Sequence, residues 1–80
     1  MRIPRDISGQ ELCKLLGKFG YLITRQKGSH IRLTTELPST HHITIPNHSP
    51  IKLGTLNSIL DDISKHLAIS KIELTERLFK

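Results

Sequence analysis

The middle of the chain constrains the fold most, because its composition and spacing describe a β-hairpin followed by a third strand. Tyr21–Gln26 and His30–Thr35 are rich in β-branched and aromatic residues, and Lys27-Gly28-Ser29 separates them. A glycine in such a short connection supplies the positive φ angle of a tight turn, so these segments predict a hairpin. After a further loop, His42–Ile45 alternates polar and apolar residues and ends at Pro46, which predicts a third strand.

The two-residue period of a strand decides which side chains share a face of this predicted sheet. Ile31 and Leu33 share one face, so His30 and Arg32 take the other. By the same period, His42 lies opposite the isoleucines of its own strand. We therefore expect one apolar face, which helices cover, and one polar face, which carries histidine and arginine.

Amphipathic segments with capping signals flank the predicted sheet. Ser8 and Glu11 form a capping box ahead of an apolar stripe, and Gly20 suits the left-handed residue that ends a helix. Ser70 and Glu73 repeat the capping pattern near the end of the chain. With the apolar periodicity, these signals predict three helices, at about 9–18, 55–66 and 71–78.

The resulting order, α-β-β-β-α-α, predicts an α+β fold of two layers. Its sheet is three-stranded and antiparallel, and its helices lie on one face. The chain has 80 residues, which is room for one small core. We expect a single domain over residues 1–80.

The positive charge of the chain is concentrated in its first part. Lysine and arginine outnumber aspartate and glutamate by 12 to 7, a formal charge of +5. Residues 1–34 contain seven of the bases and two of the acids, so they carry the whole excess. A basic surface built by this part favours an anionic partner such as nucleic acid. Three aromatic residues are too few to favour an RRM-type platform for stacked bases.

The apolar runs and the cysteine content exclude other classes of protein. No apolar run exceeds three residues, against the roughly 20 that cross a bilayer, and the N-terminus lacks a signal-peptide core. We therefore expect no membrane partner and a cytoplasmic location. Cys13 is the single cysteine, which excludes an internal disulfide and a cysteine-rich metal site. We expect its side chain to be buried or half-buried in the first helix.

Four motifs occur in order along the chain: Gly20-Tyr21, then Arg25-Gln26-Lys27-Gly28-Ser29-His30, then Pro46-Asn47-His48, then Gly54-Thr55-Leu56 with Ile59-Leu60. Together they resemble the HicA-like mRNA interferase toxins of type II toxin–antitoxin modules, over about residues 6–78. The resemblance implies a double-stranded-RNA-binding-domain-like fold, cleavage of mRNA, and a HicB-like antitoxin that silences the toxin. The single catalytic histidine of the family maps to His30.

The residues around this histidine suit phosphodiester chemistry. An imidazole titrates near neutral pH, so His30 is a candidate for proton transfer. Arg25, Lys27, Arg32 and the Gly28-Ser29 turn are candidates for binding the RNA phosphate. We expect attack by the ribose 2′-hydroxyl, with no metal and no small-molecule cofactor. Position alone would favour a solvated hairpin histidine, and the motif match reverses that preference.

Lys14, Lys18 and His48 each allow two interpretations, and His66 allows one. Lys14 and Lys18 lie four residues apart on the polar side of the first helix, where they are either solvated or in contact with RNA phosphates. His48 is either an auxiliary proton-transfer group or a loop residue whose hydrogen bonds fix the turn. We expect His66, near the end of its helix, to interact with the helix dipole.

His41 and His42, with His30 and His48, invite a metal-site interpretation, which we reject. Adjacent strand residues point to opposite faces, and no H-x-x-x-H or C-x-x-C spacing is present.

Two other classes of protein fit parts of the sequence. A non-catalytic double-stranded-RNA-binding module shares the α-β-β-β-α order and the positive charge. The Gly28-Ser29-His30 turn and the lack of a lysine-rich start to the final helix argue against it. A helix-turn-helix over residues 58–80 is the other, but that segment has four bases and four acids, a poor match to a duplex phosphate surface.

Overall fold

The computed structural model describes residues 3–79, so Arg2, one of the N-terminal bases, lies outside the description. In chain order the elements are α1 (Gly9–Leu16), the 3₁₀ turn η1 (Gly17–Phe19), β1 (Leu22–Lys27), β2 (His30–Thr35), β3 (His41–Pro46), α2 (Leu53–Leu67) and α3 (Lys71–Phe79). This order confirms the predicted α-β-β-β-α-α arrangement. None of the helices in this part of the chain is long and apolar enough to cross a membrane.

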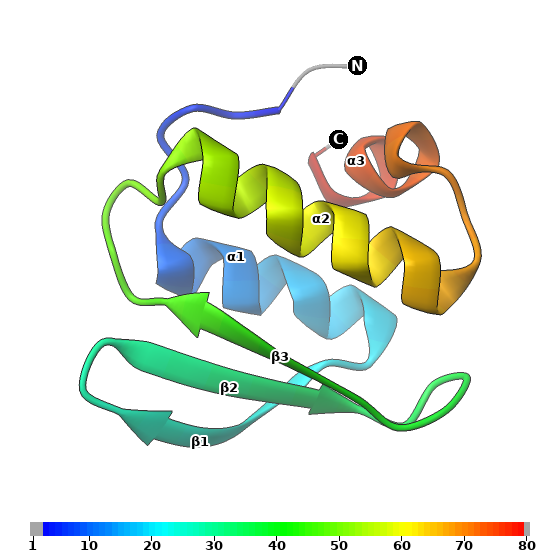
Figure 1. The fold of residues 1–80 in the computed structure, drawn as a ribbon, viewed down its shortest axis with the longest axis horizontal. Helices are drawn as coiled ribbons and strands as arrows, with labels where there is room; N and C mark the ends of the chain where they lie inside the picture. The colour runs from blue at the N-terminus through cyan, green and yellow to red at the C-terminus, as the bar shows by residue number, and fades with distance from the viewer. Residues whose placement is uncertain (1–2, 80) are drawn as a thin grey trace.

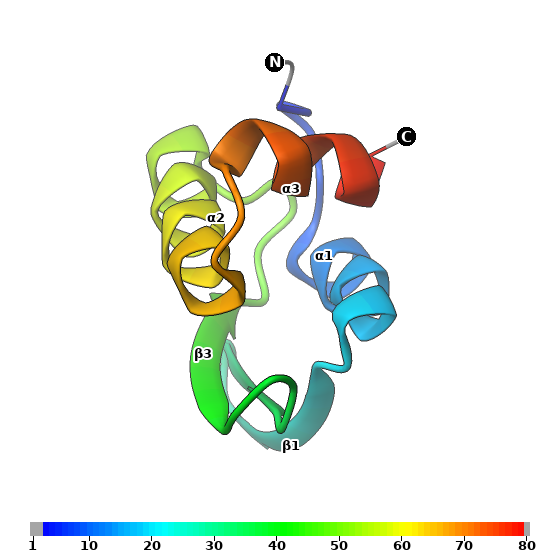
Figure 2. The same cartoon turned by 90° about the vertical axis from the view of Figure 1, so that its right-hand side faces the viewer.

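The three strands form one antiparallel sheet with the order β1-β2-β3, and the helices lie on one side of it (Figure 1). The end-on view shows α1 and α2 next to each other above the sheet (Figure 2). Helix α3 contacts both of them on the side away from the sheet. The predicted α+β fold class is therefore confirmed, and its order is compatible with a double-stranded-RNA-binding-domain-like fold.

Helix α1 begins at the predicted capping box but ends at Leu16, and the 3₁₀ turn η1 continues the chain to the predicted stop at Gly20. The Ser8 hydroxyl accepts a hydrogen bond from the Glu11 amide at 3.1 Å, and the Glu11 carboxylate accepts one from the Ser8 amide at 2.9 Å. The Ser8 amide, and then the Ser8 hydroxyl, hold the pKa of the Glu11 carboxyl below its ordinary value. After η1, Gly20 adopts the expected left-handed conformation with φ of 85°.

Strands β2 and β3 carry the sheet side of the core. Ile31, Leu33, Ile43 and Ile45 are buried beneath the helices, as their alternation predicts. The polar residues between them are exposed on the other face or partly so. The remaining buried apolar side chains that complete this core are Ile7, Leu12, Cys13, Leu16, Tyr21, Ile51, Leu56, Ile59, Leu60, Ile63, Leu74 and Leu78.

Strand β1 departs from the simple picture of one apolar face, because all its side chains are exposed. The register shifts between Ile23 and Arg25, so Thr24 stands at a bulge. Leu22 is 68% exposed and Ile23 is 58% exposed. The apolar face covered by helices is therefore built by β2 and β3, and β1 is an edge strand beyond it.

The start of α1 approaches the end of β3 closely. The Gly9 amide donates to the His48 carbonyl at 2.9 Å. A Cβ at position 9 would lie 2.2 Å from the Pro46 carbonyl oxygen. Only glycine allows this approach, which fixes the loop after β3 against the helix layer.

Candidate functional site

The β1–β2 turn places His30 at the start of the central strand. Gly28 has a φ of 58°, the left-handed conformation that the turn was predicted to need. His30 pairs with Lys27 of β1 on one side and with Pro46 of β3 on the other. The Asn47 amide donates to the Ser29 carbonyl at 2.7 Å, which ties the turn to the chain leaving β3. The backbone around His30 is therefore held from both sides.

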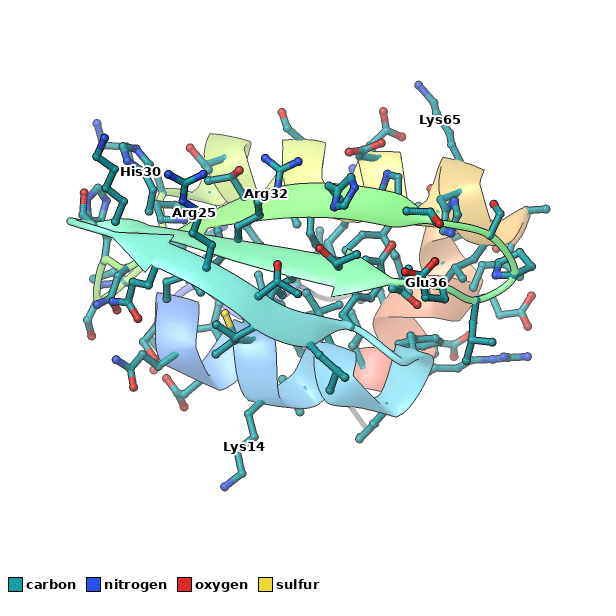
Figure 3. All side chains as sticks on the ribbon, turned by 90° about the horizontal axis from the view of Figure 1, so that it is seen from below. Lys14, Arg25, His30, Arg32, Glu36 and Lys65 are labelled. Atoms are coloured by element: carbon teal, nitrogen blue, oxygen red, sulfur yellow. The ribbon has the colours of Figure 1, made fainter. Side chains whose placement is uncertain are left out.

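Cross-strand pairing brings basic side chains together around His30. Arg25 lies opposite Arg32, Lys27 opposite His30, and Arg32 opposite Thr44. Directly opposed residues point to the same face of a sheet. The five line a hollow of about 180 Å³ on the polar face, which we call the cationic hollow. Figure 3 shows Arg25, His30 and Arg32 grouped over the strands.

The charge in the cationic hollow is not neutralised by neighbouring acids. Within residues 3–79, the ion pairs join His41 to Asp62, Lys65 to Asp61 and Arg77 to Glu73. None of them involves Arg25, Lys27 or Arg32, and all three are exposed. An anionic group in the hollow would meet three cations without displacing an internal partner, which favours a phosphate.

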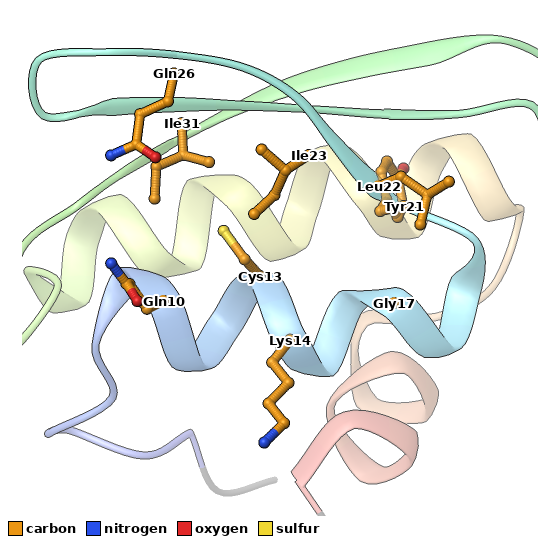
Figure 4. A pocket seen from close by; sticks show the side chains of 9 residues that line it. All are labelled: Gln10, Cys13, Lys14, Gly17, Tyr21, Leu22, Ile23, Gln26 and Ile31. Atoms are coloured by element: carbon orange, nitrogen blue, oxygen red, sulfur yellow. The ribbon is translucent and has the colours of Figure 1, made fainter.

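The other predicted phosphate ligands lie in a different part of the molecule. Lys14 extends from α1 away from Arg25, His30 and Arg32 (Figure 3). It lines a separate groove of about 530 Å³ between α1 and β1, together with Cys13 and Ile23 (Figure 4). Lys18 is exposed on η1. The structure thus brings Arg25, Lys27 and Arg32 together around His30, and it places the two lysines on the helix layer.

His48 is exposed in the loop after β3, two residues beyond the partner of His30. Its carbonyl accepts from the Gly9 amide, so its backbone fixes the loop. An auxiliary catalytic role for its side chain stays a prediction. Cys13 is buried, as expected, and burial raises the pKa of its thiol.

Tyr21, His41 and Asp62 form a cluster at the other end of β3, which no sequence pattern predicted. The Tyr21 hydroxyl is 2.7 Å from Nδ1 of His41, and Nε2 of His41 is 3.4 Å from the Asp62 carboxylate. Burial, and then the Asp62 charge, raise the pKa of Tyr21 to about 12, so the phenol is protonated at neutral pH and can donate to Nδ1 of His41. When it does, the neutral imidazole carries its proton on Nε2, which faces Asp62.

His66 belongs to the same cluster. It lies in the last turn of α2, where it was expected to interact with the helix dipole. Its Nε2 is 3.2 Å from the Leu37 carbonyl, and its ring stacks on His41 at 4.2 Å between centroids. The strand period does place His41 and His42 on opposite faces, but no sequence signal links His41 to Tyr21, Asp62 or His66, which lie 20 or more positions away. Over residues 3–79, no three His, Cys, Asp or Glu side chains are placed to hold one metal ion.

Comparison with known protein families assigns the chain to a family. The family model described as the HicA toxin of bacterial toxin–antitoxin matches residues 9–64, which include α1, the whole sheet and most of α2. The chain belongs to the HicA toxin family, and it is the toxin of a toxin–antitoxin system, whose partner is an antitoxin. No curated protein and no solved structure gave a significant match.

Proposed function

We propose that the protein is an mRNA interferase, an endoribonuclease that cleaves mRNA in the cytoplasm and inhibits translation. The cationic hollow carries this proposal, because it sets one exposed imidazole among three cations without acidic partners. Membership of a toxin family supports the biological role. A HicB-like antitoxin would silence the activity by covering the hollow.

The reaction we propose uses the chain's own groups. The ribose 2′-hydroxyl attacks the adjacent phosphorus, the bond from phosphorus to the 5′-oxygen breaks, and a 2′,3′-cyclic phosphate and a 5′-hydroxyl result. His30 moves a proton in this step, either from the 2′-hydroxyl or to the leaving oxygen. Arg25, Lys27 and Arg32 hold the phosphate and offset the charge that develops on its oxygens.

The decisive experiment compares wild type with His30→Ala on RNA in the presence of EDTA. We expect wild-type cleavage to persist and the variant to lose about 10²- to 10⁴-fold in rate, the usual contribution of a proton-transfer group. His30 is exposed, so the variant should unfold at the same urea concentration as wild type. Equal rates would remove His30 from the mechanism, and loss of wild-type cleavage in EDTA would remove the metal-free reaction.

A charge-matched pair tests the role of the cations. Arg32 lines the cationic hollow, whereas Lys65 is an exposed base on α2 that pairs with Asp61. We expect Arg32→Gln to slow cleavage by about 10²-fold and Lys65→Gln to leave it unchanged. His48→Ala, measured alongside, decides whether the loop histidine is auxiliary.

Expression in cells tests the biological role. The wild-type protein should arrest growth, His30→Ala should not, and co-expression of the antitoxin should restore growth. RNA binding without cleavage by the wild-type protein would instead indicate a non-catalytic double-stranded-RNA-binding module.

A further inference from the structure

A second hollow continues from the cationic hollow along the edge strand β3. It measures about 340 Å³ and shares Arg32 and Thr44 with its neighbour. Its other walls come from β3 and from α2, and we call it the β3–α2 hollow. These walls are formed by His42, Ile43, Ser58, Ile59 and Asp62. A ribose-phosphate chain held at Arg32 would therefore meet this hollow next.

The distance along the sheet shows that the second hollow serves a different group from the scissile phosphate. His30 pairs with Pro46, and His42 pairs with Thr34, four residues further along β2. At about 3.3 Å per residue, the two histidines lie roughly 13 Å apart along the strand. Proton transfer to one phosphate needs contact within about 3 Å, so His42 cannot share the phosphate that His30 acts on. In a bound RNA, His42 would lie beside a flanking nucleotide.

The chemistry of the β3–α2 hollow favours a base over a phosphate. Ile43 and Ile59 are largely buried and contribute apolar side chains to its lining. Asp62 adds a negative charge that offsets the shared Arg32, disfavours a second phosphate and accepts hydrogen bonds from donors on a base edge. His42 adds an aromatic ring, the kind of surface on which unpaired RNA bases stack.

Two of the polar residues that line the hollow, His42 and Asp62, are positioned by contacts with neighbouring side chains. Nδ1 of His42 shares a hydrogen bond of 2.8 Å with the Thr34 hydroxyl, which in turn lies 3.0 Å from the Thr24 hydroxyl. Asp62 Oδ1 contacts His41, whose ring is fixed by the buried Tyr21. Such support reduces the freedom that each side chain would lose on binding a ligand.

We infer that the β3–α2 hollow binds the base of a nucleotide flanking the cleaved bond, and that Asp62 selects bases with an exocyclic amino group over uracil. Adenine, cytosine and guanine each present amino hydrogens to a carboxylate, whereas uracil has no amino group and its one ring N–H on that edge lies between two carbonyl oxygens that the charge repels. The inference rests on the proposed function and adds a sequence preference to it.

The test compares Asp62→Asn with Asp61→Asn, a matched control on the same helix. Both carboxylates are exposed, but Asp61 pairs with Lys65 and does not line the hollow. An RNA pool of random sequence is cleaved, and the bases around each cut are read by sequencing. We expect wild type and Asp61→Asn to disfavour uridine at one flanking position by about fivefold or more, the size of a single hydrogen-bond readout. In Asp62→Asn this preference should fall below about twofold, because an amide also donates to uracil.

A binding experiment separates this inference from the proposed catalysis. Short oligouridylates carrying one cytidine, adenosine or guanosine are titrated against His30→Ala protein, which would leave the RNA intact. We expect the oligonucleotides with a substituted base to bind His30→Ala protein more tightly than oligouridylate does. Adding Asp62→Asn should abolish this difference, and adding Asp61→Asn should keep it. That result supports the base site even if the wild-type protein cleaves nothing. The same base preference in Asp62→Asn and wild type, or no preference in either, overturns the inference and leaves the nuclease proposal standing.

Discussion

Replacing Tyr21 by phenylalanine tests the cluster that supports Asp62, and the expected effect changes with pH. Tyr21 is 1% exposed, and its hydroxyl shares a hydrogen bond of 2.7 Å with Nδ1 of His41. At about pH 8, Tyr21→Phe removes this bond and leaves a half-buried imidazole nitrogen without it, which should cost about 1 kcal/mol in the free energy of unfolding. The ring itself stays in the core, so no cavity opens.

The pKa of the phenol then predicts a crossover. Burial and the Asp62 charge raise the pKa of Tyr21 from 10.0 to about 12 in the folded protein. A group whose pKa is raised on folding contributes its full stabilisation of the folded state below its unfolded pKa, here about pH 10. This contribution is lost as the pH rises through the folded pKa of about 12. At about pH 11 the unfolded tyrosine is mostly ionised and the folded one is not, which costs wild type about 1 kcal/mol. The variant has no phenol to ionise, so it should equal or slightly exceed wild type in stability there.

Urea unfolding of both proteins at the two pH values measures the effect. Tyr21 is the one tyrosine and the chain has no tryptophan, so the phenolate absorbance also reports its pKa directly. A difference in unfolding free energy that does not change between the two pH values would refute the reasoning. So would a native phenol that ionises at its ordinary pKa.

Three further experiments, two of them matched pairs of substitutions, test the packing and the helix cap. Gly9→Ala forces a Cβ to 2.2 Å from a backbone carbonyl oxygen and should lower the free energy of unfolding by about 1–3 kcal/mol. In the matched control Gly17→Ala, the new Cβ meets no atom within 4 Å, so this change should be neutral or stabilising. Equal thermal midpoints for the two variants would contradict the close approach at Gly9. In urea unfolding, Leu33→Ala should lower the free energy of unfolding by about 2–5 kcal/mol and Ile23→Ala by less than about 1 kcal/mol, because only Leu33 is fully buried. A large loss for Ile23→Ala would place β1 in the core. Ser8→Ala should cost about 1 kcal/mol through the lost helix cap, and an unchanged unfolding midpoint would show that the capping box adds nothing.

The proposed activity and the proposed base preference use adjacent parts of one surface. The cationic hollow would hold the phosphate at one end of the polar face, and the β3–α2 hollow would hold a base beside it; Arg32 lines both. An antitoxin that covers Arg32 would therefore block both hollows at once. The separate groove at Lys14 would stay open under such a cover.

The sequence by itself determined the elements and the polar face. Capping boxes, turn glycines and strand alternation act over a few residues, so Ser8, Gly28 and the pair Ile31 and Leu33 could be interpreted without knowing the fold. The same local logic put His30 and Arg32 on one face, and the motif singled out His30.

Only the tertiary structure decided which distant residues meet. The bulge at Thr24 and the edge position of β1 left Ile23 outside the core, although its residue type suits a buried strand. Packing of α2 against β3 brought Asp62 to His41 and opened a hollow beside Arg32. These contacts join residues 20 or more positions apart, and they depend on how helices and sheet pack, which no local pattern of residues encodes.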